Sequence, residues 1–325
     1  MERANKINLA IRISIGIFGS MFLFSACTKQ RAATQSTGPD YSPASSFYNT
    51  YKQPLQIIQV DSPGTGPIFG KMGTRLSGDA SIFMYPGNPS KAVIYPITLN
   101  LIEIYPEKDM ILSQMPSVGG STILQTGGEI YITAYKGTQQ LVLRPGKKYT
   151  MYLDTSKSLI TGMSVYYGFA GSGAIAFTDW TSNVNQLNPA IGLPDTLSKV
   201  INLPLFYQMN IAQMGWVNCA QASPGQSANL TFSVPVNSTN TQNLNVFLAC
   251  NSFHSMVQVY GLSCTVSIPI GTTFTAVAIA QDANSNNSLV YCSQNITVTG
   301  SAQIIALNPT TISSANLITD LSAFH

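Results

Sequence analysis

The sequence contains few charged residues and almost no histidine. Only 9% of its 325 residues are Asp, Glu, Lys or Arg, whereas globular proteins average about a quarter. The basic residues are scattered and the formal net charge is only +3, so we expect no nucleic-acid partner. His254 is the only histidine before the terminal His325, and its surroundings predict a solvated loop. Catalysis that needs an imidazole base is therefore disfavoured.

Motifs of hydrolysis, phosphate binding and zinc binding are missing too. The chain has no Gly-x-Ser-x-Gly or His-Glu-x-x-His sequence, and no glycine-rich phosphate loop between a strand and a helix. The densest acidic group, Glu103, Glu107 and Asp109, predicts a strand end and a solvated turn rather than a glycosidase carboxylate pair. A calcium site in this turn is a second interpretation, although the spacing fits no EF-hand. For Glu129, which follows two glycines, we expect a side chain that caps a turn or forms a salt bridge there.

The N-terminus has the layout of an export signal. Its basic residues precede a run without charge from Ile13 to Ala26; they are Arg3, Lys6 and Arg12. This run is shorter than the about 20 residues that span a bilayer, and it predicts a signal peptide over residues 1–26. An ordinary secretory signal followed by an accidental cysteine is the other interpretation.

The residues at the end of this segment, Phe24-Ser25-Ala26-Cys27, resemble the lipobox of bacterial lipoproteins. The resemblance implies cleavage before Cys27, a diacylglycerol on its thiol and an acyl chain on its amine, so that the membrane becomes a partner through palmitate-type chains. Thr28 follows the cysteine where an Asp would retain the protein at the inner membrane, which favours the outer membrane. No acidic run occupies residues 28–32, which favours the periplasmic face over the cell surface.

Four further cysteines lie in the C-terminal half and are spaced too widely for Cys-x2-Cys zinc ligands. They are Cys219, Cys250, Cys264 and Cys292. An even number in an oxidising compartment predicts disulfides, with three connectivities that the sequence does not distinguish. Free thiols that act as small apolar core residues are the alternative. We expect no metal site, no cofactor and no catalytic residue.

Composition divides the first part of the mature chain into a tether and a domain. Residues 27–53 are rich in Ser, Thr, Ala, Gln and Pro and predict a flexible tether that begins at the acylated cysteine. Residues 54–155 contain short alternating apolar runs broken by Gly, Pro and Asn, which predict antiparallel strands. Residues 156–218 are less regular and predict a connector with short strands.

The last part of the chain alternates again. Residues 219–310 contain five or six apolar–polar runs with turn residues between them, which predict an immunoglobulin-like β-sandwich. In residues 311–325, Leu317, Leu321 and Phe324 share one helical face after Ser313, so a short capped C-terminal helix or tail is expected. The whole chain is therefore predicted to be all-β, with two sandwich-like domains joined by an irregular connector.

Two segments are similar to known domain families. The first contains the runs 73–76, 101–113, 124–131 and 141–147, which begin with Gly73-Thr74-Arg75-Leu76. Through these runs, residues 69–154 resemble a ZU5-type β domain of Bacteroidota lipoproteins. Residues 228–300 resemble a carboxypeptidase regulatory-like β-sandwich, mainly through Ile268-Pro269-Ile270-Gly271-Thr272. The resemblances imply a fold and an envelope location, and no activity.

Aromatic residues are the most suggestive binding candidates. The sequence has 15 Tyr, 14 Phe and two Trp, and four of these could line a platform that stacks a glycan or a peptide. They are Tyr166, Tyr167, Trp180 and Trp216. Buried packing, especially of Trp216 at a domain junction, is the alternative interpretation.

The sequence therefore predicts a non-enzymatic lipoprotein of the cell envelope that serves as a structural or protein-interaction module. Exposed edge strands would offer its partners a site for strand addition. The alternative is a carbohydrate-binding lipoprotein that uses surface aromatics. The expected partners are the membrane, through the N-terminal lipid, and an unidentified envelope protein or glycan.

Overall fold

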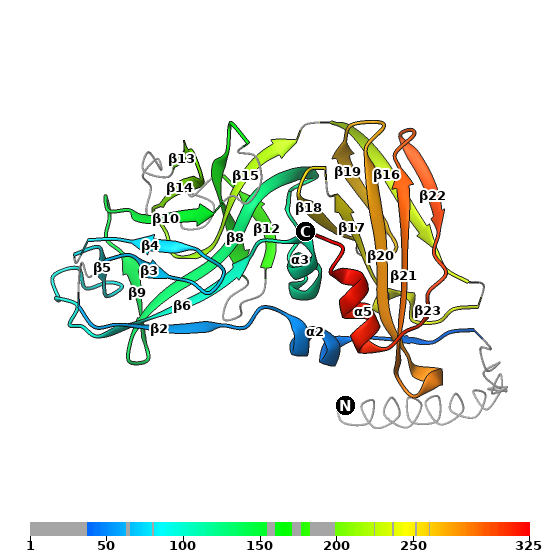
Figure 1. Cartoon of the computed structure of the whole chain (residues 1–325), viewed down its shortest axis with the longest axis horizontal. Coiled ribbons are helices and arrows are strands. Elements are labelled where there is room, and N and C mark those ends of the chain that lie inside the picture. Colours follow the sequence, from blue (N-terminus) through cyan, green and yellow to red (C-terminus); the bar gives the residue numbers. More distant parts are fainter. Residues whose placement is uncertain are drawn as a thin grey trace, which may run out of the picture. The chain divides into compact units, whose positions relative to one another are not determined.

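The structure, a computed structural model, describes residues 38–62, 66–79, 81–154, 160–170, 177–182, 199–223, 225–235, 237–250, 252–259 and 261–325. The predicted signal peptide, Cys27 and the first part of the tether lie outside these residues. The described chain consists mostly of β-strands with three short α-helices, and most strand pairs are antiparallel (Figure 1). The fold is therefore all-β, as the alternation of apolar and polar residues predicts.

One sheet, which we call the five-stranded sheet, has a buried face and an outer face. Its strands are, in spatial order, β13 (Lys199–Leu203), β14 (Phe206–Ile211), β10 (Tyr149–Asp154), β4 (Arg75–Ser77) and β3 (Ile68–Phe69). Alternate side chains of these strands point to opposite faces. Leu76, Met151 and Met209 lie in register across three of the strands and are fully buried. They form part of a first hydrophobic core.

A second sheet, the long sheet, covers the other side of this core and continues beyond it. Its main path is β12 (Phe177–Thr181), β11 (Ser164–Ala170), β15 (Gly215–Ser223), β8 (Thr122–Lys136), β19 (Ser263–Ile268), β16 (Gln226–Ser233) and β22 (Ala302–Ala306). The strands that branch from this path are β2 (Gln56–Val60), β5 (Phe83–Met84), β6 (Ile97–Ile104), β7 (Val118–Gly119) and β9 (Gln139–Leu143).

The 15-residue strand β8 carries the long sheet from one core to the next. Its C-terminal part pairs with β6 and β9, and its first residues pair with β7 and β19. A register shift against β15 follows Thr126, where Gly128 has a φ of 143° and a Cβ would lie 2.7 Å from the Tyr105 ring. Only glycine adopts this conformation without strain, so Gly128 permits the bulge at which the strand changes its surroundings.

The C-terminal sheet packs face to face on β16, β19 and β22, as in a β-sandwich. Its strands are β18 (Ser255–Val259), β17 (Asn245–Cys250), β20 (Thr273–Asp282), β21 (Ser288–Thr297) and β23 (Thr310–Thr311), and β1 (Tyr41–Ser42) pairs with β20. Val246, Leu248 and Ala276 face Leu230 and Phe232 in a core between the sheets. The predicted sandwich-like architecture of this segment is confirmed.

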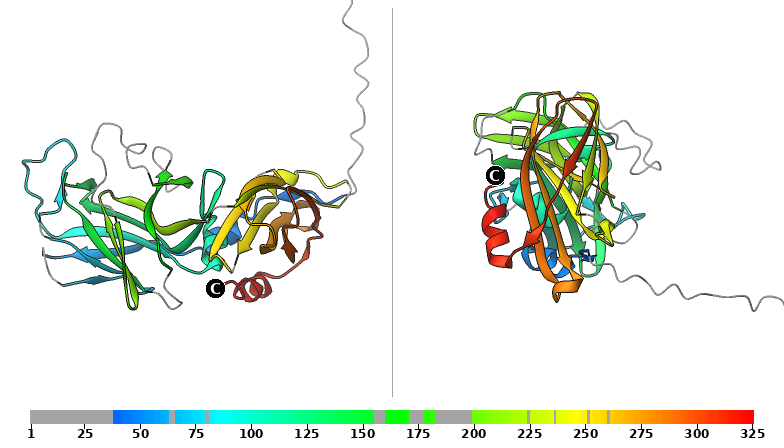
Figure 2. Two further views of the ribbon diagram at one scale, coloured as in Figure 1. Left: turned by 90° about the horizontal axis from the view of Figure 1, so that it is seen from above. Right: turned by 90° about the vertical axis from the view of Figure 1, so that its right-hand side faces the viewer.

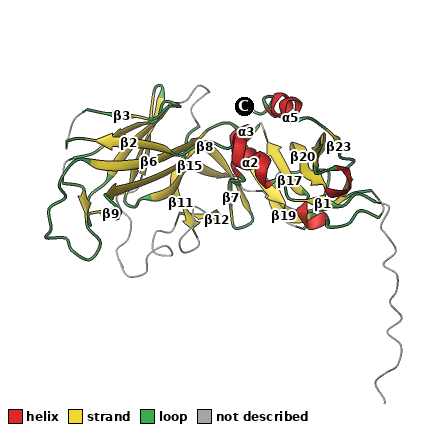
Figure 3. Ribbon diagram, turned by 90° about the horizontal axis from the view of Figure 1, so that it is seen from below, coloured by secondary structure: helices red, strands yellow, loops and turns green. Residues whose placement is uncertain are grey.

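Helices cover the opposite face of the C-terminal sheet (Figures 2 and 3). They are α2 (Ser45–Tyr51), α3 (Glu107–Ser113) and α5 (Ser314–Leu321). Phe247 and Val277, which alternate with the sandwich core residues, pack with the helices in a further core. None of the described helices is long and apolar enough to cross a bilayer.

The predicted C-terminal helix is confirmed, whereas part of the predicted tether is folded. In α5, the Ser313 Oγ accepts a hydrogen bond from Asn316 N at 3.2 Å, and the predicted face, including Leu317, is buried. Within residues 27–53, the structure has β1 and α2, and Phe47 and Tyr48 are only 5% exposed. The polar composition of the segment concealed these few large aromatic residues, which fold the chain back onto the C-terminal sheet.

Candidate functional site

The four predicted aromatic residues do not form an exposed platform. Trp180 and Trp216 are 2% and 4% exposed. The Trp180 Nε1 donates a hydrogen bond to the Pro116 carbonyl at 2.8 Å, and the Trp216 ring lies 5.2 Å from the Tyr131 ring. Both tryptophans belong to the core beneath the helices, which is the packing role that the sequence left open.

The two consecutive tyrosines lie on opposite faces of β11. Tyr167 is buried in the first core, and its hydroxyl accepts a hydrogen bond from Ala212 N at 3.0 Å. Tyr166 is half-buried against the core that holds Trp180 and Trp216. Because neighbouring residues of a strand point to opposite faces, the pair cannot present two rings to one ligand. The predicted aromatic platform is therefore not assembled.

The four cysteines are free thiols in the structure, so none of the predicted disulfides is formed there. Each faces a residue other than cysteine across its strand pair: Val165, Ser255, Leu230 and Ala278. Burial raises the pKa of all four thiols, for Cys264 to about 11. The alternative interpretation, small apolar core residues, fits these surroundings. Because the thiolate is the reactive form, these cysteines are poor nucleophiles.

The acidic group near residue 105 is buried, contrary to the solvated turn that was predicted. Glu107 and Asp109 lie in the first turn of α3 and are 0% and 5% exposed. Asp109 accepts a hydrogen bond from Gln53 Nε2 at 2.7 Å, and burial raises its pKa. The sequence did contain a helix signal, because acidic residues after Pro106 precede the apolar run 110–112.

Glu103 holds the loop between β3 and β4. It is 1% exposed and accepts hydrogen bonds from Gln56 Nε2 at 2.7 Å, Met72 N at 3.0 Å and Thr74 N at 2.9 Å. A Cβ on Gly70 would lie 2.4 Å from this carboxylate. The donors occupy both oxygens, so Glu103 has a structural role and cannot reach a substrate.

Glu129 is the centre of a second buried polar group, which we call the Glu129 cluster: Ser117, Thr126, Glu129 and Asn218. Glu129 is fully buried, and its Oε1 accepts hydrogen bonds from Ser117 Oγ at 2.7 Å and Asn218 Nδ2 at 3.4 Å. Its Oε2 has no partner among the described residues. Burial, only partly offset by Ser117, raises the pKa of Glu129 to about 8, so the carboxyl is neutral below that pH.

The cluster also fixes the loop that contains His254. Thr126 Oγ1 donates to Asn218 Oδ1 at 2.6 Å, and the Thr126 carbonyl accepts from His254 Nδ1 at 2.7 Å. Thr126 N donates in turn to the His254 carbonyl at 3.1 Å. His254 is half-buried and has a φ of 45°, so the predicted solvated histidine is in fact bound to β8. Sequence reasoning missed this contact because it joins residues more than a hundred positions apart.

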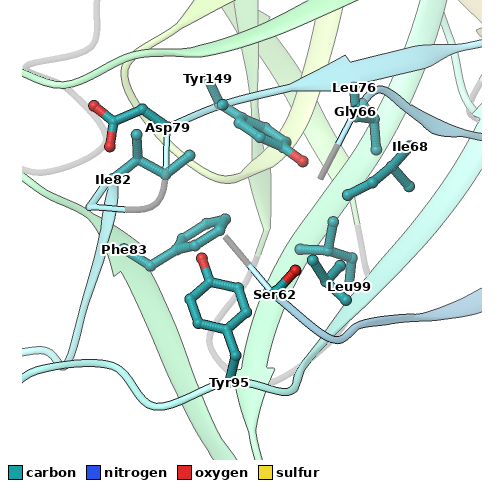
Figure 4. A pocket seen from close by; sticks show the side chains of 12 residues that line it. Ser62, Gly66, Ile68, Leu76, Asp79, Ile82, Phe83, Tyr95, Leu99 and Tyr149 are labelled. Carbon is teal, nitrogen blue, oxygen red and sulfur yellow. The ribbon is translucent and has the colours of Figure 1, made fainter. Parts of the chain in front are cut away.

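Of the acidic, histidine and cysteine side chains described above, only Cys292 lines one of four cavities among the described residues. A small cavity of about 30 Å³ lies among Phe83, Tyr95 and Tyr149 (Figure 4) and has room for about one water molecule. Larger hollows of about 580, 660 and 730 Å³ lie at the surface. No group of three or more His, Cys, Asp or Glu side chains that could hold a metal ion occurs in the described part of the chain.

Neither a protein-family model nor a curated protein sequence matches the chain.

Proposed function

We propose that the protein is a lipid-anchored, non-enzymatic component of the cell envelope whose β-structure acts as a structural or protein-interaction module. The observation that carries the proposal is the sequence Phe24-Ser25-Ala26-Cys27 after a basic and then an apolar segment. Acylation at Cys27 would place the protein at the outer membrane, facing the periplasm.

The surroundings of the acidic and thiol groups support a non-catalytic role. The buried carboxyl groups of Glu103 and Glu129 are hydrogen-bonded to the protein's own loops and strands. Burial also keeps the cysteines in the thiol form. Groups that could serve as acid, base or nucleophile are thus used to build the fold.

The length of chain between the lipid and the folded part limits where partners can be. The compact unit begins at Gly38, and the residues between Cys27 and Gly38 can extend over roughly 40 Å at most. The folded part would therefore remain close to the membrane surface.

Edge strand β2 supports a role in protein interaction. Among the described strands it pairs only with β6, so its other edge offers backbone groups to a further strand. Ile57, the second residue of β2, is 72% exposed. An exposed apolar side chain on an open edge is a contact that a partner strand would cover.

Lipid attachment is tested by labelling cells with a palmitate analogue. We expect the label on the wild-type protein and none on the Cys27→Ser variant, which would also accumulate with residues 1–26 uncleaved. Labelling of Cys27→Ser as strong as that of the wild type would overturn the lipoprotein assignment.

The interaction role is tested by crosslinking the full chain in cells and comparing the captured proteins between two variants. Ile57→Lys in β2 should abolish capture of a partner, and Ile304→Lys, at a 78% exposed residue of β22, should leave it unchanged. Equal capture by both variants and the wild type would exclude β2 as the interaction edge.

A further inference from the structure

The outer face of the five-stranded sheet brings together cationic, polar and aromatic side chains, although only 9% of the residues are charged. The register of the strands aligns two rows across this face. The first row is Lys199, Asn210, Thr150 and Ser77. The second row is Ile201, Gln208, Tyr152, Arg75 and Phe69. Residues two apart along a strand point to the same side, so the two rows form one surface.

The first row borders a positively charged hollow. The hollow has a volume of about 660 Å³, and its lining includes Lys147, Lys148, Lys199 and Asp79. Asp79 is already occupied, because it accepts hydrogen bonds from the N and Oγ of Ser81 at 2.6 and 2.7 Å and pairs with Lys147 at 3.0 Å. Lys148 and Lys199 are exposed and have no carboxylate within 4.0 Å among the described residues. The hollow therefore carries excess positive charge.

Arg75 in the second row is held by aromatic rings instead of by an acid. Its guanidinium carbon lies 3.9 Å from the centre of the Phe206 ring and 5.3 Å from the centre of the Tyr152 ring. Asp154, on the same face of β10, forms no ion pair with it. The rings fix the guanidinium plane while its N–H donors keep their capacity for a carboxylate or phosphate.

Asn210, between Lys199 and Thr150 in the first row, has an unused donor. Its side chain is fully buried, and its Oδ1 accepts a hydrogen bond from Thr150 Oγ1 at 2.9 Å. Its Nδ2 has no hydrogen-bond partner among the described residues. Buried amide groups are normally satisfied, so this row lacks an acceptor.

We propose that this face binds an acidic saccharide. Its carboxylate or phosphate would accept hydrogen bonds from Arg75 and the lysines of the hollow, since charge-assisted bonds to a fixed guanidinium are strong and directional. The ring of Phe69, which is 61% exposed and lies opposite Arg75, would stack against the sugar. Neither the proposed lipid anchor nor the β2 edge is needed for this binding.

The experiment measures binding of trigalacturonic acid and glucose 6-phosphate to the full chain in detergent by calorimetry. Maltotriose, glucose and inorganic phosphate serve as matched probes without the charge or without the sugar. We expect at least one of the two acidic saccharides to bind tenfold or more tightly than its neutral counterpart and than inorganic phosphate. The proposal would be overturned if the acidic saccharides bound no more tightly than their neutral counterparts, or no more tightly than inorganic phosphate.

Variants locate the binding. Arg75→Gln and Lys199→Gln should each weaken binding of the acidic saccharide about tenfold or more, the effect of losing one charge-assisted contact. Arg75→Lys retains the charge without the planar fork and should restore only part of the affinity. Lys108→Gln, in α3, is the charge-matched control and should bind like the wild type. An equal loss in Lys108→Gln, or no loss in Arg75→Gln and Lys199→Gln with unchanged thermal unfolding, would refute the assigned site.

Discussion

At the scale of single residues, the protein buries acidic side chains in two different ways. Glu103 is surrounded by donors, including the backbone N–H groups of Met72 and Thr74. Glu129 has few donors, and one of its oxygens has no partner among the described residues. Because a buried charge is costly without compensating hydrogen bonds, Glu129 is best accommodated as a neutral acid.

This difference predicts how stability depends on pH. Burial raises the pKa of Glu129 from 4.5 to about 8, so between these pH values the folded state holds a proton that the unfolded state has released. The contribution of this proton to stability is complete below the unfolded pKa. It is lost as the pH rises from the unfolded pKa through the folded pKa, by at most about 1.4 kcal/mol per pH unit. In Glu129→Gln this part of the pH dependence should vanish. At pH 9 the variant should be more stable than the wild type by roughly 2–4 kcal/mol.

Urea unfolding of both proteins between pH 4 and pH 9 measures this effect. Asp320→Asn is the control, because it removes an exposed acid in α5 and should leave the wild-type pH dependence unchanged. If Glu129→Gln and the wild type lose stability in parallel as the pH rises, the neutral carboxyl is not the cause.

At the scale of secondary-structure elements, α5 depends on its N-cap. The Ser313 Oγ satisfies the N–H of Asn316 in the first turn, and Leu317 and Leu321 anchor the helix to the C-terminal sheet. Ser313→Ala should therefore lower the free energy of unfolding by about 1 kcal/mol. Ser314→Ala changes the first helical residue, where alanine is well tolerated, and should be nearly neutral. Equal urea midpoints for Ser313→Ala and the wild type would show that the cap does not stabilise the protein.

The strands could be predicted from sequence more fully than the helices. Alternation within β10, β20 and β21 is local and requires no knowledge of the partner strands. Helix α3 had a local signal after Pro106, but the burial of its first-turn acids Glu107 and Asp109 depends on contacts that the sequence does not display. Helix α2 was missed because its segment is too polar and too short to show a helical period. The same limit applies to the outer face of the five-stranded sheet, where Arg75, Tyr152 and Phe206 meet only through strand pairing.

At the scale of the whole unit that the structure describes within residues 38–325, backbone pairing of β8 joins the parts on either side of it. The strand pairs with β6 in the first core and with β19 beside the sandwich core. The core beneath the helices also combines residues from both sides, including Trp216 of β15 and Val277 of β20. Loss of structure in the first core would therefore remove hydrogen bonds and apolar contacts from the C-terminal sheet.

This sharing predicts that a cavity in the first core destabilises the C-terminal sheet as well. Leu101 is fully buried in the first core, and Leu101→Ala should lower the free energy of unfolding by about 2–5 kcal/mol. Hydrogen exchange followed by mass spectrometry should show that the most protected amides of β20 lose as much protection as those of β6, because both exchange through the same global opening. Ser77→Ala, at an exposed position of β4, should change neither the free energy of unfolding nor the amide protection of β6 and β20. If protection falls in β6 while β20 retains the wild-type value, the parts unfold separately and β8 does not couple them.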